Sequence, residues 1–157
     1  METEIEGDLL EILNQFDTLP FIFVGSGISR RYLDLEDWVR ILTKFSEKTG
    51  KPFSYYRSSA DGDLTQASKL IANDFHRVWF EITPGNEIKN YEEQLINYSS
   101  PIKIEISKYL EEKSRQIVDN QQIKEELEWF KKAIFDGIIT TNWDVLLEHL
   151  FPDYMVF

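Results

Sequence analysis

The sequence has 157 residues, 42% of them hydrophobic and 14% aromatic, which is enough to bury the core of one ordinary domain. A formal net charge of -11 disfavours binding to a nucleic-acid backbone, and the lack of cysteine excludes disulfides and thiolate metal sites within these residues. No apolar run approaches the roughly 18 residues of a membrane span and the start is acidic, so we expect a cytoplasmic protein without direct membrane or nucleic-acid contact.

The first third of the chain predicts a helix, a strand and a second helix. Apolar residues at helical spacing indicate a helix over residues 3–16. The uninterrupted apolar run over residues 21–24 predicts a strand covered on both faces, as in a parallel sheet, and Gly25 ends it. Asp34 is a candidate N-cap for a helix that continues up to Gly50.

The rest of the chain predicts several helices, one strand and a closing helix. Asp63 with Gln66 resembles a capping box. Apolar stripes at helical spacing lie at residues 64–78, 102–110, 123–134 and 143–150. The run at 138–141 predicts a second buried strand. We therefore expect one α/β unit whose strands are separated by a long helical insertion, at about residues 50–135.

A glycine loop follows the first predicted strand. In an α/β sheet, ligands gather beyond the carboxyl ends of strands, where glycines let backbone N–H groups approach a phosphate. Gly25 and Gly27 would allow that approach, and Ser29 or Arg30 would contact the anion directly. The same spacing is equally typical of a plain tight turn.

A second polar segment follows the second predicted strand. Asn142 and Asp144 lie beyond its end, where an amide and a carboxylate would face the glycine loop. Taken alone, Asn142 is more typical of an N-cap with Asp144 in the first helical turn. Two such segments, each after a buried strand, favour a shared ligand site.

Together, "FVGSGIS" and "ITTNWD" resemble the paired NAD-site signatures of the sirtuin (Sir2) superfamily. The first is similar to the family's GAGxS loop, and the second to its TQN-x-D segment in the TTN-aromatic-D form of bacterial SIR2-like defence proteins. The resemblance implies a Rossmann-like parallel sheet of the SIR2 type, present in part, with a large helical insertion between the motif-bearing strands.

The resemblance also implies roles for individual residues. Gly25, Ser26, Gly27 and Ser29 match the loop that holds the NAD pyrophosphate. Thr141, Asn142 and Asp144 match the segment beside the nicotinamide ribose, where Asn142 is needed to cleave the glycosidic bond. Such cleavage develops oxocarbenium character, which an uncharged amide can accommodate while it orients ribose hydroxyls.

The chain departs from the family in one respect. The family has a catalytic histidine in a His-Gly pair downstream, whereas His76 and His149 are not followed by glycine and are typical of helix surfaces. We therefore expect residues 1–157 to be the N-terminal part of a longer domain and to be inactive alone. The zinc module of sirtuin deacylases also lies downstream, so its presence stays open, and no metal site is evident here.

Three functions are compatible with these observations. The first is an NAD+ hydrolase (NADase) that depletes NAD+ in bacterial antiviral defence, with activity gated by homo-oligomerisation or by a larger complex with a regulatory or ATPase partner. The second is an NAD-dependent protein deacylase or ADP-ribosyltransferase. The third is a non-catalytic module that binds NAD or ADP-ribose or serves in assembly. The TTNWD form and the helical interval favour the first.

Overall fold

The computed structural model describes residues 2–156, with side chains described from residue 5. The chain divides into two compact units: an α/β unit formed by residues up to Leu35 and from Ser114 onward, and a helical unit, Glu36–Lys113. The helical stretch was expected at about 50–135, whereas the helical unit begins and ends earlier in the sequence. The chain is thus mixed α/β and mostly helical.

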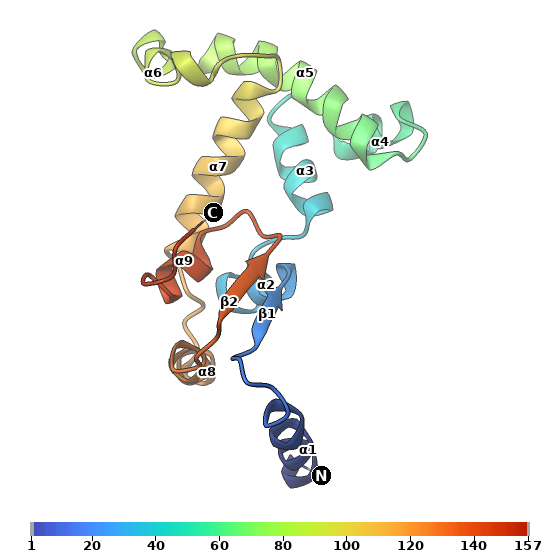
Figure 1. Ribbon diagram of the computed structural model, residues 1–157. Helices are drawn as coiled ribbons and strands as arrows, with labels where there is room; N and C mark the ends of the chain where they lie inside the picture. Colours follow the sequence, from blue (N-terminus) through green and yellow to red (C-terminus); the bar gives the residue numbers. More distant parts are fainter. Residues whose placement is uncertain (1, 157) are drawn as a thin grey trace. The chain divides into compact units, whose positions relative to one another are not determined.

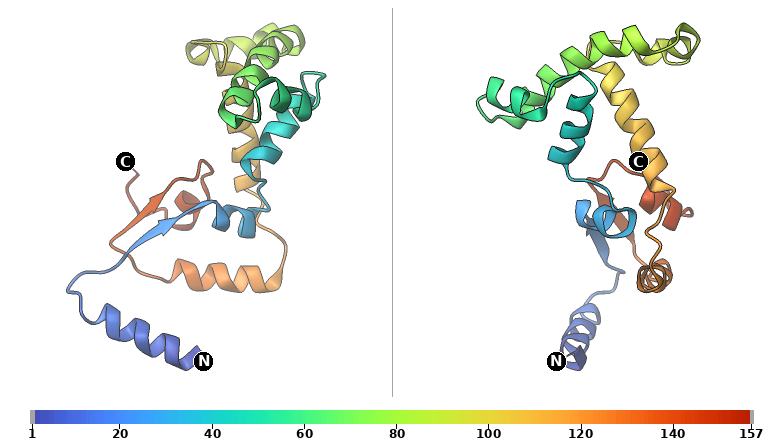
Figure 2. Two further views of the ribbon diagram at one scale, coloured as in Figure 1. Left: turned by 90° about the vertical axis from the view of Figure 1, so that its right-hand side faces the viewer. Right: turned by 180° about the vertical axis from the view of Figure 1, so that it is seen from behind.

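The α/β unit contains a two-stranded parallel sheet, in which β1 (Phe21–Val24) pairs with β2 (Gly137–Thr140). The strands lie side by side and point the same way (Figures 1 and 2). Phe21 pairs with Gly137 and Val24 with Thr140, so both strands end together. The two predicted strands are confirmed, and the arrangement is consistent with part of a Rossmann-like fold.

One face of this sheet forms the core of the α/β unit. Val24 packs with residues of α2 (Ser26–Leu33), α8 (Gln121–Lys131) and α9 (Leu146–Leu150), and Ile22 and Ile138 contact the same cluster. The expectation that β1 is covered on both faces is wrong, and β2, expected to be buried, is half-buried at best. Alternate side chains of a strand point to opposite faces, and on the second face Phe21 is 65% exposed and Phe23 72% exposed.

A helix that was not expected, α2, lies between the glycine loop and the helix predicted to continue up to Gly50. α2 starts directly after Gly25, and Asp34 ends it as a C-cap in the left-handed conformation, with φ of 50°. The N-cap assigned to Asp34 is therefore wrong. Asp37 takes that role for α3 (Trp38–Glu47), because its side chain accepts a hydrogen bond from the Arg40 N–H at 2.9 Å.

The first predicted helix is confirmed as α1 (Glu2–Leu13), which ends three residues earlier than expected. Its apolar stripe is exposed rather than buried: Ile5 is 69% exposed and Leu9 53% exposed. Within residues 2–156, no helix combines the length and apolar character needed to cross a bilayer.

The helical unit is built around α5 (Leu64–Ile82), which contacts both α3 and α4 (Phe53–Ser59). α5 also lies across one end of α7 (Ser100–Ser114), as Figures 1 and 2 show. Phe45 and Phe75 meet edge to face in the core, with ring centroids 5.9 Å apart. Asp63 is confirmed as the N-cap of α5, because it accepts from the N–H groups of Thr65 and Gln66.

Three short elements of the helical unit were not expected from the sequence. They are α4, α6 (Gly85–Lys89) and the 3-10 helix η1 (Glu92–Gln94). Each is seven residues or shorter, so each offers too few positions for helical periodicity to stand out.

Candidate functional site

The loops after β1 and β2 start next to each other. The Val24 carbonyl, at the end of β1, accepts hydrogen bonds from the Thr140 hydroxyl at 3.1 Å and from the Thr141 N–H at 3.4 Å. Because these bonds join the two strand ends, the glycine loop and the TTNWD segment leave the sheet at one place. Parallel strands make this the edge where α/β proteins bind ligands.

The glycine loop presents bare backbone at the start of α2. Gly25 is the N-cap residue and gives no side-chain cap, and Ser26 and Gly27 are the first two residues of the helix. The first N–H groups of a helix have no partner within it and carry the positive end of the helix dipole. The start of α2 is therefore suited to an anion.

Nothing in the described part of the chain requires glycine at position 25 or at position 27. Gly25 has φ of -108°, which any residue adopts, and Gly27 lies in regular helix. A Cβ built on either would meet no described atom of another part of the chain within 4 Å. The space beside both residues is thus open, as close approach of a ligand to the backbone would require.

Asn142 connects the second loop to the first. Its side-chain amide donates to the Gly25 carbonyl at 3.1 Å and to the Ser29 hydroxyl at 2.9 Å, while its own N–H donates to the Thr140 hydroxyl at 3.0 Å. Both amide protons are used, so the side chain has a fixed orientation. The amide oxygen accepts no hydrogen bond from the residues described here and is available to a ligand hydroxyl.

Asp144 completes a buried polar chain. The Ser29 hydroxyl donates to Asp144 Oδ2 at 2.6 Å, and the Leu146 N–H donates to Oδ1 at 3.2 Å. Ser29 is 1% exposed and Asp144 8% exposed. A buried carboxylate requires such hydrogen-bond donors. Here the donors form a chain, in which Asn142 donates to Ser29 and Ser29 donates to Asp144.

The structure brings together five of the predicted site residues: Gly25, Ser29, Thr141, Asn142 and Asp144. Ser29 and Asp144 act on the site through other residues, because their polar atoms are engaged within the protein. The buried pair of Ser29 and Asp144 therefore positions the glycine loop and the Asn142 amide. This is a supporting role, whereas the sequence predicted that both residues contact NAD.

The other predicted residues lie on the surface. Ser26, Gly27 and Arg30 are exposed. Arg31, next to the predicted Arg30, is committed elsewhere: its guanidinium forms a two-point ion pair with Glu126 of α8, at 2.5 and 2.8 Å. The hydrogen bond from Arg31 lowers the pKa of Glu126. The pair ties α2 to α8 and leaves Arg30 as the basic side chain adjoining the loop.

Sequence reasoning missed the part played by Thr140. Its hydroxyl donates to the Val24 carbonyl and accepts from the Asn142 N–H, so it joins β1 to the second loop. A threonine at a strand end, immediately before a polar segment, is the signal that could have identified it.

Neither the two histidines nor any cluster of potential metal ligands forms a further site among the described residues. His149 is exposed in the last turn of α9, and His76 of α5 packs its ring against Phe80, with centroids 4.9 Å apart. No described hydrogen bond or ion pair joins His149 to Asn142 or Asp144. Over the part of the chain that the structure describes, no group of three or more His, Cys, Asp or Glu side chains is placed to hold a metal ion.

Comparison with protein-family models, with curated proteins and with solved structures finds no match to this chain in any of the three. The functional argument therefore depends on the two loops and their geometry.

Proposed function

We propose that the α/β unit carries the NAD-binding loops of a SIR2-like NAD+ hydrolase, which cleaves the nicotinamide–ribose bond and depletes NAD+ in antiviral defence. The observation that carries this proposal is the hydrogen-bonded chain from Asn142 through Ser29 to Asp144. It joins residues 113 and 115 positions apart in the sequence, and these are residues of the two motifs that resemble the sirtuin signatures.

The glycine loop supports binding of the NAD pyrophosphate. The space beside Gly25 and Gly27 is open, and the first N–H groups of α2 have no side-chain cap. A diphosphate there would receive backbone hydrogen bonds and the favourable end of the helix dipole. Arg30 is exposed next to this loop and would add a positive charge.

The fixed amide of Asn142 supports the bond-breaking step. When the C1′–N bond breaks, its electron pair neutralises the nicotinamide nitrogen and leaves positive charge on the ribose. The free amide oxygen of Asn142 would hold a ribose hydroxyl or the attacking water, and the buried Asp144 carboxylate would keep that amide in place through Ser29. Water then bonds to C1′ and gives its proton to a base.

The base is the part for which the described residues give no candidate. In the family that the motifs resemble, a histidine has this role, and neither His76 nor His149 follows the family's His-Gly pattern. This favours a second candidate function: binding of NAD or ADP-ribose without turnover.

One experiment separates these functions. The full-length protein is used, because residues 1–157 alone are expected to be inactive. It is incubated with NAD+ in the absence of any acyl or peptide acceptor; release of nicotinamide is measured, and ADP-ribose binding is measured by calorimetry. The hydrolase proposal expects nicotinamide release that Asn142→Ala lowers about 100-fold or more, because a positioned polar group is lost. The matched control is Asn73→Ala, at an exposed position of α5, which should behave as wild type.

The outcomes are distinct. Equal turnover by wild type and Asn142→Ala would refute the assignment of the site. Binding of ADP-ribose without nicotinamide release would support the binding module. Release that requires an acylated peptide would indicate a deacylase, and neither binding nor release would refute all three.

A further inference from the structure

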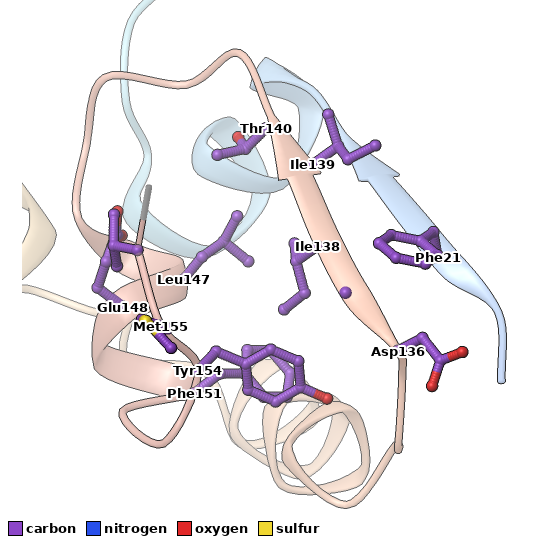
Figure 3. A pocket seen from close by; sticks show the side chains of 12 residues that line it. Phe21, Asp136, Ile138, Ile139, Thr140, Leu147, Glu148, Phe151, Tyr154 and Met155 are labelled. Carbon is purple, nitrogen blue, oxygen red and sulfur yellow. The ribbon is translucent and has the colours of Figure 1, made fainter.

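Thr140 is the last residue of β2 and lies at the edge of the sheet from which both loops leave (Figure 3). Alternate side chains of a strand point to opposite faces, so Thr140 shares a face with Ile138 and not with the exposed Ile139. The β-branched shape of Thr140 suits a strand, but valine would suit it equally. The strand alone therefore does not explain the hydroxyl.

The Thr140 hydroxyl is oriented by two hydrogen bonds to backbone groups. It accepts from the Asn142 N–H at 3.0 Å, and its single proton is donated to the Val24 carbonyl at 3.1 Å. A serine hydroxyl could make the same two bonds, whereas valine, which has nearly the same shape as threonine, could make neither. The hydroxyl therefore links the backbone of Asn142 to the end of β1.

Asn142 is held to the first loop at two points. Its side-chain amide donates directly to the Gly25 carbonyl at 3.1 Å, and its backbone N–H is joined to the Val24 carbonyl through Thr140. Val24 and Gly25 are successive residues, so both connections refer to the same short piece of backbone. Without the Thr140 hydroxyl, the side chain of Asn142 would keep its own bonds, but its backbone would lose this connection.

The place of the Asn142 amide oxygen matters for the proposed reaction. That oxygen would hold a ribose hydroxyl or the attacking water, and a displacement of about 1 Å in such a group can cost about 100-fold in rate. The proton of the Thr140 hydroxyl and one of its lone pairs are used within the protein. Thr140 therefore acts on the site through Asn142.

We propose that Thr140 is a positioning residue for Asn142: its hydroxyl holds the second loop to the end of β1, so that the Asn142 amide oxygen keeps one place in the site. This inference rests on the proposed NAD+ hydrolysis, in which Asn142 is needed for bond cleavage. It gives a role to a residue for which the resemblance of the motifs implied none.

The test compares two variants of the full-length protein. Thr140→Val removes the hydroxyl and keeps the β-branched shape, and Thr140→Ser keeps the hydroxyl. We expect Thr140→Val to lower the kcat of nicotinamide release about tenfold or more, because the amide is less well placed. The KM for NAD+ and the affinity for ADP-ribose should stay within about threefold of wild type, because the glycine loop is unchanged. Thr140→Ser should restore kcat to within about threefold.

A second measurement reports on the backbone of Asn142 directly. Amide hydrogen exchange at Asn142 should be faster in Thr140→Val than in wild type or Thr140→Ser, because the N–H loses its acceptor. The matched control is Thr43→Val in α3, which also removes a hydroxyl that donates to a backbone carbonyl, that of Val39 at 2.8 Å. It should leave kcat unchanged. Thr140→Ala removes the same hydroxyl and is used if Thr140→Val does not fold.

Several results would overturn the assignment of Thr140 while leaving NAD+ hydrolysis in place. They are wild-type kcat in Thr140→Val, equal loss of kcat in Thr140→Ser, or unchanged exchange at Asn142. A parallel loss of kcat and ADP-ribose affinity would show a general structural defect instead of a positioning role. Absence of nicotinamide release by wild type would refute the proposed hydrolysis itself, and this inference with it.

Discussion

In the α/β unit two buried polar side chains join the loops at the ends of the strands, whereas in the helical unit a half-buried carboxylate joins two helices. Ser29 and Asp144 join two loops beside open backbone. In the helical unit, Asp74 accepts hydrogen bonds from Lys51 and Tyr56, at 2.7 and 2.8 Å, and so holds α4 to α5. The bond between Ser29 and Asp144 supports an adjoining ligand site. The bonds of Asp74 are fully accounted for by the packing of α4 against α5.

Replacing one aspartate in each unit gives the sharpest test of this comparison. Asp144→Ala should lower the free energy of unfolding by about 2–3 kcal/mol, because it leaves the buried Ser29 hydroxyl and the Leu146 N–H without an acceptor. It should also abolish binding of ADP-ribose. Denaturant unfolding and calorimetry give the two values.

Asp74→Ala is the matched control, since it too removes a carboxylate with two partners. We expect a loss of about 1–2 kcal/mol in stability, because this group is only partly buried, with ADP-ribose binding kept. If both variants lose stability and both keep binding, the polar chain of the α/β unit is only a structural tie.

The second test concerns acid stability of the helical unit. Partial burial alone would raise the pKa of Glu36, but hydrogen bonds from Lys44, at 2.7 Å, and from Tyr109 outweigh it and lower the pKa to about 2. A pKa below the ordinary value of 4.5 stabilises the fold above about pH 4.5, and this contribution is lost as the pH falls toward about 2.

Glu36→Gln should therefore cost about 1 kcal/mol at neutral pH and progressively less below pH 4.5. The measurement is urea unfolding of wild type and variant across this range, with Glu47→Gln at an exposed position of α3 as control. A difference independent of pH would contradict the assigned ion pair. Loss of ADP-ribose binding would contradict the division of roles between the units.

The smallest expected effect on stability comes from the glycine loop. Gly27→Ala should stabilise the protein by about 0.5–1 kcal/mol, since alanine favours helix and its Cβ meets open space. Gly7→Ala in α1 is the matched control, with the same freedom around its Cβ.

Binding separates the two glycine variants. The Cβ of Gly27→Ala would occupy the space that a diphosphate needs, so ADP-ribose binding should weaken, whereas Gly7→Ala should bind normally. Unchanged binding by Gly27→Ala would mean that the open space at the loop is not used by this ligand.

Local patterns predicted much of the secondary structure. The apolar run at 21–24 gave β1 with the observed bounds, and Asp63 gave the start of α5, because strand runs and N-caps are encoded within a few residues. The prediction of Asp34 as an N-cap was wrong because an aspartate also tolerates the left-handed conformation that ends a helix. Its sequence neighbourhood fits both roles.

The meeting of the two loops was predictable from the sequence, but the hydrogen bonds that join them were not. The two motifs identified Asn142 and Asp144, yet the partner of Asp144 is Ser29, which lies 115 positions away, and no local pattern predicts that bond. Coverage of both strand faces was also unpredictable. It depends on which helices pack against the sheet, and the exposure of Phe23 follows from that packing alone.

The separation of the paired strands has a consequence for folding kinetics. Val24 and Thr140 are 116 positions apart, so the parallel pair is a contact of high sequence separation. Closing such a loop costs about 3 kcal/mol more in chain entropy than closing a hairpin of about four residues. Helices with local contacts form faster than distant strand pairs. We therefore expect the Ser29 to Asp144 bond to form late, after the helices of residues 36–113 have shortened the flexible chain between the strands.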